Sequence, residues 1–232
     1  MKEKKVSIII PAYNEEKNIT STLSHLNLKW VKEIIVVDDG SDDKTYDLAK
    51  NFNISLYRFS KNKGKGEAVT FAVKKAEGDI ILLIDADLGN SVREAEKLVK
   101  PIINDEVQIT IAEIPIRGGG IGLVRKVAEL ILYFLTKRKM KAPLSGQRAF
   151  RRNTINELMP FSVGFGLELG MDIDIIINNF TYKEILCNFQ HDVTGQSITG
   201  YYHRFKQLCD ILKTSVVKWY QLINVEIDYS KE

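Results

Sequence analysis

The chain has 232 residues, of which 44% are hydrophobic and 27% are charged, and its formal net charge is +3. This composition is typical of a globular protein with its own core, and the charge is too small to indicate a nucleic-acid partner. The two cysteines, Cys187 and Cys209, form no Cys-x-x-Cys pattern, which argues against a zinc site and favours a reduced, cytoplasmic protein. No apolar run approaches the ~20 residues that span a bilayer, so we expect a soluble protein.

Strands and helices are expected to alternate over the first half of the chain. Short apolar runs end in acids, glycine or proline, and segments of helix length separate them. The alternation predicts an α/β fold with a parallel, doubly wound sheet. Strands are expected at residues 6–10, 33–37, 54–59, 79–84 and 108–114, and helices through residue 26, at 42–51, at 67–76 and at 91–100, the last ended by Pro101.

Paired acids follow two of these expected strands. Asp38 and Asp39 end one strand, and Asp85 and Asp87 end another. In open parallel sheets, ligands bind beyond the carboxyl ends of the strands. Residues two apart in extended backbone point the same way, so Asp85 and Asp87 can share a cation, and oxygen ligands of this kind suit Mg²⁺ or Mn²⁺. Taken alone, Asp85 and Asp87 fit a solvated turn equally well, and the second acidic pair favours a binding site.

The second half of the chain changes character. Apolar residues recur at helical spacing between Val124 and Leu135, and a basic cluster follows at 137–141. The apolar stripe belongs to a core helix or to a helix on a membrane surface, and the basic cluster suits anionic lipid or a phosphorylated acceptor. A strand is expected near 182–189. A helix from about 201 to 223 is expected to pack on the domain or on a partner chain, which leaves a homodimer open.

Four motifs of the first half resemble, in order and spacing, the nucleotide-sugar half of family 2 glycosyltransferases. They are Ile-Pro-Ala-Tyr-Asn-Glu-Glu at 10–16, Val-Val-Asp-Asp-Gly-Ser at 36–41, Asn-Lys-Gly-Lys-Gly at 62–66 and Asp-Ala-Asp at 85–87. The resemblance implies the GT-A fold, a Rossmann-like doubly wound, mostly parallel sheet flanked by helices, with an acceptor-side extension at the C-terminus. It implies a single domain over 1–232, with a nucleotide-sugar half at 1–115, an acceptor half at 116–200 and a C-terminal helix at 201–232.

The resemblance also implies roles for individual residues of the first half. Asp85 and Asp87 match the family's Asp-x-Asp metal motif for Mg²⁺ or Mn²⁺, and Asp87 is expected to be catalytic. A divalent ion there stabilises the charge that builds on the β-phosphate as the sugar leaves. Lys65, between two glycines, is expected near the diphosphate. The residues implied in nucleotide-sugar binding are Pro11, Tyr13, Glu15, Asp38, Asp39, Lys65 and Asp85.

Two groups within the family resemble the second half. Segment 144–152 looks like the acceptor region of polyprenyl-phosphate transferases of the dolichol-phosphate mannose synthase type. Segment 164–170 and His191 are similar to glucosyl-3-phosphoglycerate synthases. The implied reaction moves a hexose from a donor of the UDP-glucose or GDP-mannose type to a phosphorylated acceptor, such as 3-phosphoglycerate or polyprenyl phosphate. The residues implied in acceptor binding are Ser145, Gly146, Gln147 and Arg148.

Three of the second-half residues have a structural alternative. Glu168 is a candidate catalytic group that orients an acceptor hydroxyl, or an acid favoured at a helix start. The resemblance makes His191 a third metal ligand beside Asp85 and Asp87, and its alternative is a packed histidine. Arg148 would hold an anionic acceptor, or it belongs to a solvated basic face.

Other function classes are weighed against a glycosyltransferase. A nucleotidyltransferase shares strand-end acids and a metal, but it normally has a glycine-rich loop with arginine after the first strand, where Pro11-Ala12-Tyr13 stands here. A non-catalytic membrane-surface or interaction module with a degenerate pocket would use the segment 121–141. A dinucleotide oxidoreductase and a P-loop kinase are disfavoured because their glycine motifs are missing. The expected location is the cytoplasm, and contact with the inner face of the membrane is left open.

Overall fold

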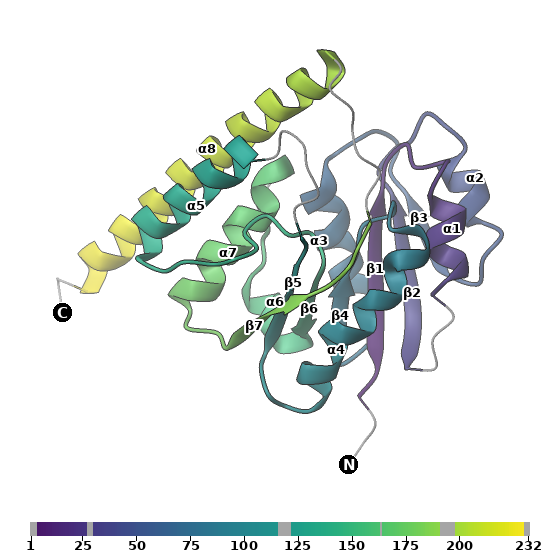
Figure 1. The fold of residues 1–232 in the computed structure, drawn as a ribbon, viewed down its shortest axis with the longest axis horizontal. Coiled ribbons are helices and arrows are strands. Elements are labelled where there is room, and N and C mark those ends of the chain that lie inside the picture. Colours follow the sequence, from purple (N-terminus) through teal and green to yellow (C-terminus); the bar gives the residue numbers. More distant parts are fainter. Residues whose placement is uncertain (1–3, 27–29, 116–121, 163, 191–197, 230–232) are drawn as a thin grey trace.

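A computed structural model describes residues 4–26, 30–115, 122–162, 164–190 and 198–229 (Figure 1). Within these ranges, seven strands form one sheet in the order β3-β2-β1-β4-β6-β5-β7. The strands are β1 (Val6–Ala12), β2 (Val31–Asp38), β3 (Ser55–Arg58), β4 (Ile80–Leu83), β5 (Ile109–Glu113), β6 (Arg148–Arg151) and β7 (Tyr182–Leu186). All neighbouring pairs are parallel except the two that involve β6. The predicted α/β class with a mostly parallel sheet is therefore confirmed.

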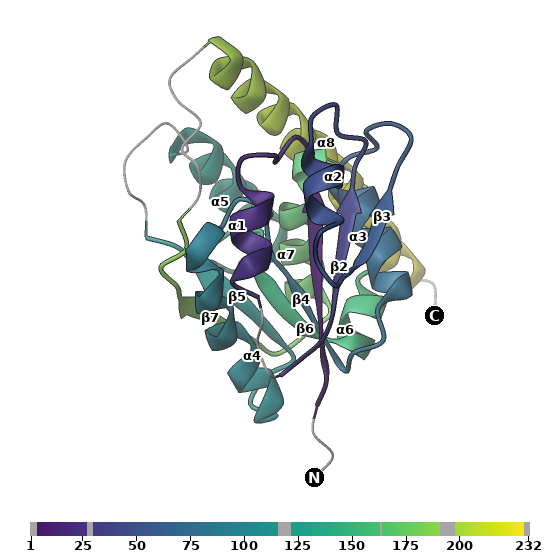
Figure 2. The ribbon, with the colours of Figure 1, turned by 90° about the vertical axis from the view of Figure 1, so that its right-hand side faces the viewer.

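Helices cover both faces of the sheet (Figure 2). The α-helices are α1 (Ile19–Ser24), α2 (Thr45–Ala49), α3 (Lys65–Lys75), α4 (Glu96–Ile103), α5 (Gly122–Thr136), α6 (Arg152–Glu157), α7 (Leu167–Ile177) and α8 (Ile198–Tyr229). Two short 3₁₀ helices are η1 (Gly89–Ala95) and η2 (Gly164–Gly166). The doubly wound arrangement follows from strands that are apolar on both faces.

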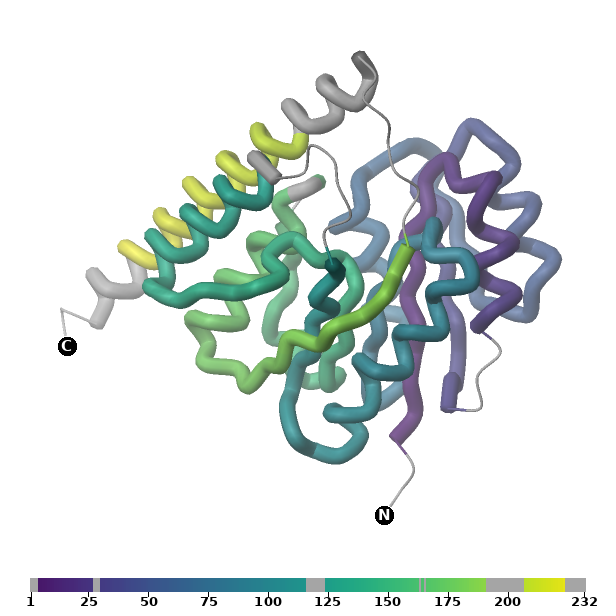
Figure 3. Tube along the Cα trace, viewed as in Figure 1, coloured from purple at the N-terminus to yellow at the C-terminus, as the bar shows by residue number. Residues whose placement is uncertain are grey.

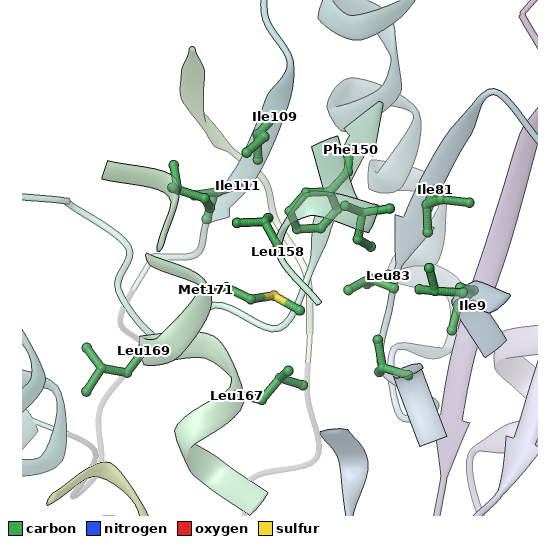
Figure 4. Packing of buried hydrophobic residues seen from close by; sticks show 14 of the residues in the cluster. Ile9, Ile81, Leu83, Ile109, Ile111, Phe150, Leu158, Leu167, Leu169 and Met171 are labelled. Carbon is green, nitrogen blue, oxygen red and sulfur yellow. The ribbon is translucent and has the colours of Figure 1, made fainter. Parts of the chain in front are cut away.

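Successive residues of the central strands feed two separate cores. Ile8 and Leu82 point to the face covered by α1, α2, η1 and α4. Ile9 and Ile81 point to the opposite face, where α3, α5, α6 and α7 pack. Figure 4 shows this second core from close by, with Phe150 beside the sheet residues. Because side chains alternate along a strand, each buried strand serves both cores at once.

Strand β6 was not predicted from the sequence, in which segment 144–152 was identified only by its resemblance to an acceptor region. Residues Arg148–Arg151 instead run antiparallel between β4 and β5, and Arg148 lies opposite both Leu83 and Ile111. Ala149 and Phe150 are fully buried on opposite faces of the sheet. The strand is short and flanked by arginines, so it carries too few apolar residues for a recognisable pattern. It brings a segment of the second half into the centre of the sheet.

The position of Pro101 also differs from the prediction. We expected Pro101 to end its helix, but it lies inside α4, which continues to Ile103. Leu98 and Ile102, on either side of it, are fully buried. Packing of this helix on the sheet therefore outweighs the backbone hydrogen bond that proline cannot make.

The two long helices of the second half contact each other along one edge of the molecule (Figures 1 and 3). Helix α8 includes the predicted helix at 201–223, and it also packs against α7 and η2. Val124, Ala128 and Leu132 of α5 are buried in the core, which confirms the interpretation of the apolar stripe at 124–135 as part of a core helix. Among the residues that the structure describes, no helix is long and apolar enough to cross a membrane.

Candidate functional site

The candidate site lies where β2, β1 and β4 end side by side. These three strands are parallel neighbours, so their carboxyl ends share one edge of the sheet. The Asp39 N–H donates to the Ala12 carbonyl at 2.8 Å, and the Ile84 N–H donates to the Ile9 carbonyl at 3.1 Å. The two acidic pairs predicted from the sequence therefore flank the end of β1. Figure 1 shows the three strands together.

The loop after β1 is tied to the loop after β2. The Asn14 N–H donates to Ser41 Oγ at 2.9 Å, and the Asp42 N–H donates to Asn14 Oδ1 at 2.9 Å. The Glu15 N–H donates to Thr45 Oγ1 at 2.7 Å. Asn14 has a positive φ of 56°, a conformation that asparagine tolerates better than most residues. These bonds hold the two loops as one wall.

The three residues predicted on the first loop line this wall at different depths. The Tyr13 side chain is exposed at the rim. Pro11 is half-buried and borders a cavity of about 10 Å³, room for a single water, which Lys65 and Gly146 also line. The Glu15 side chain accepts a hydrogen bond from Asn18 Nδ2 at 3.1 Å. An aromatic side chain at the rim can stack on a planar base.

The Asp39 carboxylate organises the glycine-rich loop. Its two oxygens accept hydrogen bonds from the backbone N–H groups of Lys63 and Gly64, each at 2.7 Å. Gly40 has a φ of +72°, and a Cβ there would lie 2.6 Å from the Lys61 carbonyl carbon, so the close approach of the two loops requires glycine. Asp39 therefore fixes the start of α3, where Lys65 stands.

Asp38 is turned away from this loop and is fully buried. Its Oδ1 accepts a hydrogen bond from the Ser41 N–H at 3.1 Å, and its Oδ2 lies 3.0 Å from Arg58 Nε. Through these contacts with Ser41 and Arg58, Asp38 stabilises the turn after β2.

Lys65 joins the first half of the chain to the second half at the site. Its Nζ lies 2.7 Å from Asp85 Oδ1 and 2.8 Å from Glu168 Oε1. Burial alone would lower the pKa of Lys65, but the attraction of Asp85 and Glu168 outweighs it, and the pKa of Lys65 is raised. The ammonium group is thus charged, and it links the end of β4 to the first turn of α7.

The segment before β6 closes over this ion pair. Gln147 Nε2 donates to Asp85 Oδ2 at 2.5 Å. A Cβ on Gly146 would lie 2.7 Å from Lys65 Nζ and 2.9 Å from Asp85 Oδ2, so a larger residue there would displace the ion pair. Ser145 is buried just before them. Gly146 and Gln147, predicted on the acceptor side, therefore touch the metal motif directly.

Arg148 points inward from the same segment. The side chain is 1% exposed, its Nη1 lies 2.7 Å from Asp172 Oδ1, and its Nε donates to the Ser145 carbonyl at 2.6 Å. The Leu144 N–H donates to Asp172 Oδ2 at 3.4 Å. Burial raises the pKa of the Asp172 carboxyl to about 6, although the Arg148 guanidinium opposes this shift. The contacts of Arg148 and Asp172 with Ser145 and Leu144 anchor the loop that carries Gly146 and Gln147.

Asp172 has no predicted role in the sequence analysis. The signal in the sequence was a helix whose other residues are apolar or glycine but which carries three acids, Glu168, Asp172 and Asp174. The link from Lys65 to Glu168 was not predicted either, because these residues are far apart in sequence and only the fold brings them together.

The acids at the end of β4 fit a divalent cation. Asp85 already faces an ammonium group, which shows that a positive charge is accommodated beside its carboxylate. Asp87, also half-buried, follows two residues later. Two carboxylates with substrate phosphates suffice to hold Mg²⁺ or Mn²⁺. In the part of the chain that the structure describes, no three His, Cys, Asp or Glu residues cluster as metal ligands. His191, the predicted third ligand, lies outside the described residues.

Comparisons with known proteins agree with this arrangement. A model of the family "Glycosyl transferase family 2" matches residues 7–159. The chain is 32% identical over 177 residues to dolichol-phosphate mannosyltransferase of Pyrococcus furiosus, covering 69% of this chain and 50% of that protein. It is 31% identical over 209 residues to glucosyl-3-phosphoglycerate synthase of Petrotoga mobilis, covering 75% of this chain and 62% of that protein. The chain thus spans half to less than two thirds of the length of these relatives.

Solved structures extend the likeness beyond the family match. Glucosyl-3-phosphoglycerate synthase of Mycobacterium tuberculosis, in complex with phosphoglyceric acid, superposes with a TM-score of 0.74 at 27% identity, covering 91% of this chain and 80% of that one. The same enzyme with Mn²⁺, UDP and glucosyl-3-phosphoglycerate gives a TM-score of 0.74 at 25% identity, covering the same shares. The likeness includes the second half of the chain.

Proposed function

Because the chain belongs to glycosyltransferase family 2 and shares the GT-A fold of its solved relatives, we propose that it transfers a hexose from a nucleoside-diphosphate sugar to a phosphorylated acceptor. The donor would be of the UDP-glucose or GDP-mannose type. The observation that carries the proposal is the junction at the end of β4, where Asp85 meets Lys65 from the donor side and Gln147 from the acceptor side.

The donor would lie along the loops after β1 and β2. Tyr13 at the rim is placed to stack on the base, with Pro11 and Glu15 on the same loop. Asp39 holds the backbone of Lys63 and Gly64, which permits close approach of the diphosphate. Asp38 supports the turn beneath. Lys65, close to Asp85, would add positive charge where the leaving diphosphate becomes more negative.

Asp85 and Asp87 would hold Mg²⁺ or Mn²⁺, with His191 as a third ligand. When bound, the cation acts as a Lewis acid on the diphosphate. M. tuberculosis glucosyl-3-phosphoglycerate synthase has been crystallised with Mn²⁺ and UDP and with Mg²⁺ and UDP, which supports this assignment. The catalytic role of Asp87 would be to hold the divalent cation beside the leaving diphosphate.

The acceptor would approach from the side of Gly146 and Gln147. Glu168 is buried at the start of α7 and is held by Lys65, so its carboxylate has a fixed position at the boundary of the two halves. With an acceptor hydroxyl, Glu168 would orient it and accept its proton, a role typically worth ~10²–10⁴-fold in rate. A phosphate acceptor such as polyprenyl phosphate already carries the attacking oxyanion and needs no strong base. Ser145 and Arg148 would act by positioning this loop.

We also propose that residues 1–232 form a single domain, with a donor half at 1–115, an acceptor half at 116–200 and a C-terminal helix at 201–232. The support comes from β6, which belongs to the second half but lies between β4 and β5 of the first half. Separating the two halves would break the pairing of β6 with β4 and β5 and uncover the sheet face on which α5, α6 and α7 pack, so neither half would keep its core.

Titration calorimetry tests the donor half of the proposal. UDP, GDP, UDP-glucose and GDP-mannose are each titrated into the protein with and without Mn²⁺. We expect one base to bind, more tightly with Mn²⁺, and Asp87→Ala to abolish the metal effect. Asp47→Asn, an exposed acid of α2, is the matched control and should bind as the parent does. Failure of all four nucleotides to bind would remove the donor site and favour a non-catalytic module.

A further inference from the structure

Helix α5 has two apolar faces, and only one of them is used by the core. Val124, Ala128 and Leu132 are buried. On the outside, Leu130 is 69% exposed and Phe134 is 67% exposed, with Tyr133 between them also exposed. Residues 130, 133 and 134 are three and four apart in α5, so their side chains fall on one side of the helix and form an apolar stripe, and Lys137 follows directly after the last helical residue, Thr136.

Helix α8 has an apolar outer face of the same kind. Its inner side holds buried Ile211 and Thr214, and Lys218 is tied to Asp174 at 2.6 Å. Its outer side exposes Leu212, Val216, Val217, Trp219 and Tyr220, of which Trp219 is 52% exposed and Tyr220 is 66% exposed. Helices α5 and α8 contact each other and both contact α7, so the sides that they turn away from α7 lie next to each other along one edge of the fold (Figure 3).

Basic side chains border this surface. Lys137, Arg138, Lys139 and Lys141 are exposed directly after α5, and no acidic residue stands between Leu130 and Lys141. Lys137 Nζ lies 5.1 Å from the Phe134 ring centroid, and Lys139 Nζ lies 5.6 Å from the Tyr133 centroid. Each lysine therefore places its ammonium group over an exposed aromatic ring, which brings positive charge to the apolar stripe of α5.

We propose that the outer face of α5 and α8, defined by the two stripes and the basic segment 137–141, binds the surface of an anionic lipid bilayer. Exposed Trp, Tyr and Phe with neighbouring Lys are the side chains that settle at the headgroup level. Anionic headgroups supply the negative charge that attracts the basic segment. A second copy of the chain would bring a second basic segment to the interface, which is less favourable.

The basic segment leads directly into the loop that carries Gly146 and Gln147. Binding of this face to lipid would therefore bring the acceptor side of the candidate site toward the bilayer, where a phosphorylated lipid could reach it. This consequence rests on the proposed function, whereas the lipid-binding face rests only on the exposed side chains and the basic segment.

Vesicle co-sedimentation tests the face without any sugar substrate. The protein is mixed with vesicles of phosphatidylcholine, alone or with phosphatidylglycerol, and the bound fraction is measured at increasing lipid. We expect binding to the anionic vesicles that weakens with salt, and little binding to phosphatidylcholine alone. Lys137→Gln with Lys139→Gln should weaken binding about tenfold or more. Lys74→Gln with Lys100→Gln, which removes the same charge from α3 and α4, should not.

The apolar part is tested by Phe134→Ser with Trp219→Ser. Both side chains are exposed, so the variant should keep the parent's thermal midpoint and nucleotide affinity while losing vesicle binding. Parent protein that stays in the supernatant with anionic vesicles would overturn the proposal, as would binding that this variant leaves unchanged. A parent dimer that becomes monomeric in the variant, with no lipid binding, would assign the face to a second copy instead. If the parent protein binds none of the nucleotides, the proposed function is refuted, but the vesicle result is unaffected.

Discussion

Replacing Lys65 by methionine removes the ammonium group that links the two halves of the site and keeps most of the side-chain volume. The Nζ group makes two contacts below 3 Å, to Asp85 and to Glu168, and these side chains are 27% and 11% exposed. A hydrogen bond to a charged group contributes about 1.5–3 kcal/mol, and the partial exposure of Asp85 places that contact at the low end. Removing the ammonium group also leaves the carboxylates of Asp85 and Glu168 without their shared cationic partner. We expect Lys65→Met to lose about 2–4 kcal/mol of unfolding free energy.

Urea denaturation followed by circular dichroism measures this loss. Lys50→Met is the matched control, because Lys50 pairs with Asp47 at 3.1 Å on the surface, with side chains 54% and 71% exposed. An exposed pair of this kind is worth about 0–1 kcal/mol. A loss for Lys65→Met no larger than that for Lys50→Met would refute the reasoning that the Lys65 contacts hold the two halves together.

Mn²⁺ provides a second readout on the same variant. If a divalent cation and the Lys65 ammonium share the negative charge of Asp85, removal of the ammonium should tighten the binding of Mn²⁺ alone. Calorimetry should then show a lower Kd for Mn²⁺ in Lys65→Met than in the parent, and Mn²⁺ should restore part of the lost stability. An unchanged or weaker Mn²⁺ affinity would show that Lys65 and the cation do not compete.

Three further predictions concern the surroundings of the site. Asp87→Ala should abolish turnover while leaving the circular dichroism spectrum unchanged, and unchanged turnover would remove Asp87 from the catalytic account. Gly146→Ala should weaken the Lys65–Asp85 pair, since its Cβ would lie within 3 Å of both side chains, and should lower kcat at least about tenfold. The pKa of Asp172 is raised to about 6 in the folded protein, above its value near 4 when unfolded, so its contribution to stability is present below pH 4 and is lost as pH rises to 6. Unfolding free energies of Asp172→Asn and the parent, compared at pH 4 and pH 7, should therefore diverge by about 2–3 kcal/mol in favour of the variant, and a constant difference would contradict the assignment.

The first half of the fold, residues 1–115, was predictable because its signals are local. Each strand is a short apolar run with an acid, glycine or proline at its end, and parallel neighbours must end at one edge. That is sufficient to bring Asp39 and Asp85 to the same edge of the sheet, as the structure shows. Pro101 was misjudged because burial of Leu98 and Ile102 outweighs a local rule about proline in helices.

The second half of the chain was less predictable because its contacts are long-range. Strand β6 is identified by its neighbours β4 and β5 and not by its own composition. The ion pair of Arg148 with Asp172 joins β6 to α7, and nothing in the sequence spacing connects these residues. Helix α5 was recognised as apolar, but a one-dimensional pattern does not show which apolar residues the core leaves exposed, and Leu130 and Phe134 are therefore known only from the structure.

Product formation is the most direct test of the central claim, which is transfer of a hexose to a phosphorylated acceptor. The protein is incubated with Mn²⁺ and either UDP-glucose or GDP-mannose, together with 3-phosphoglycerate or a short polyprenyl phosphate, and the products are analysed by mass spectrometry. We predict that one donor releases its nucleoside diphosphate and that one acceptor gains a single hexose, with no product for Asp87→Ala. A donor that binds tightly with Mn²⁺ but yields no glycosylated acceptor in any combination would contradict the claim.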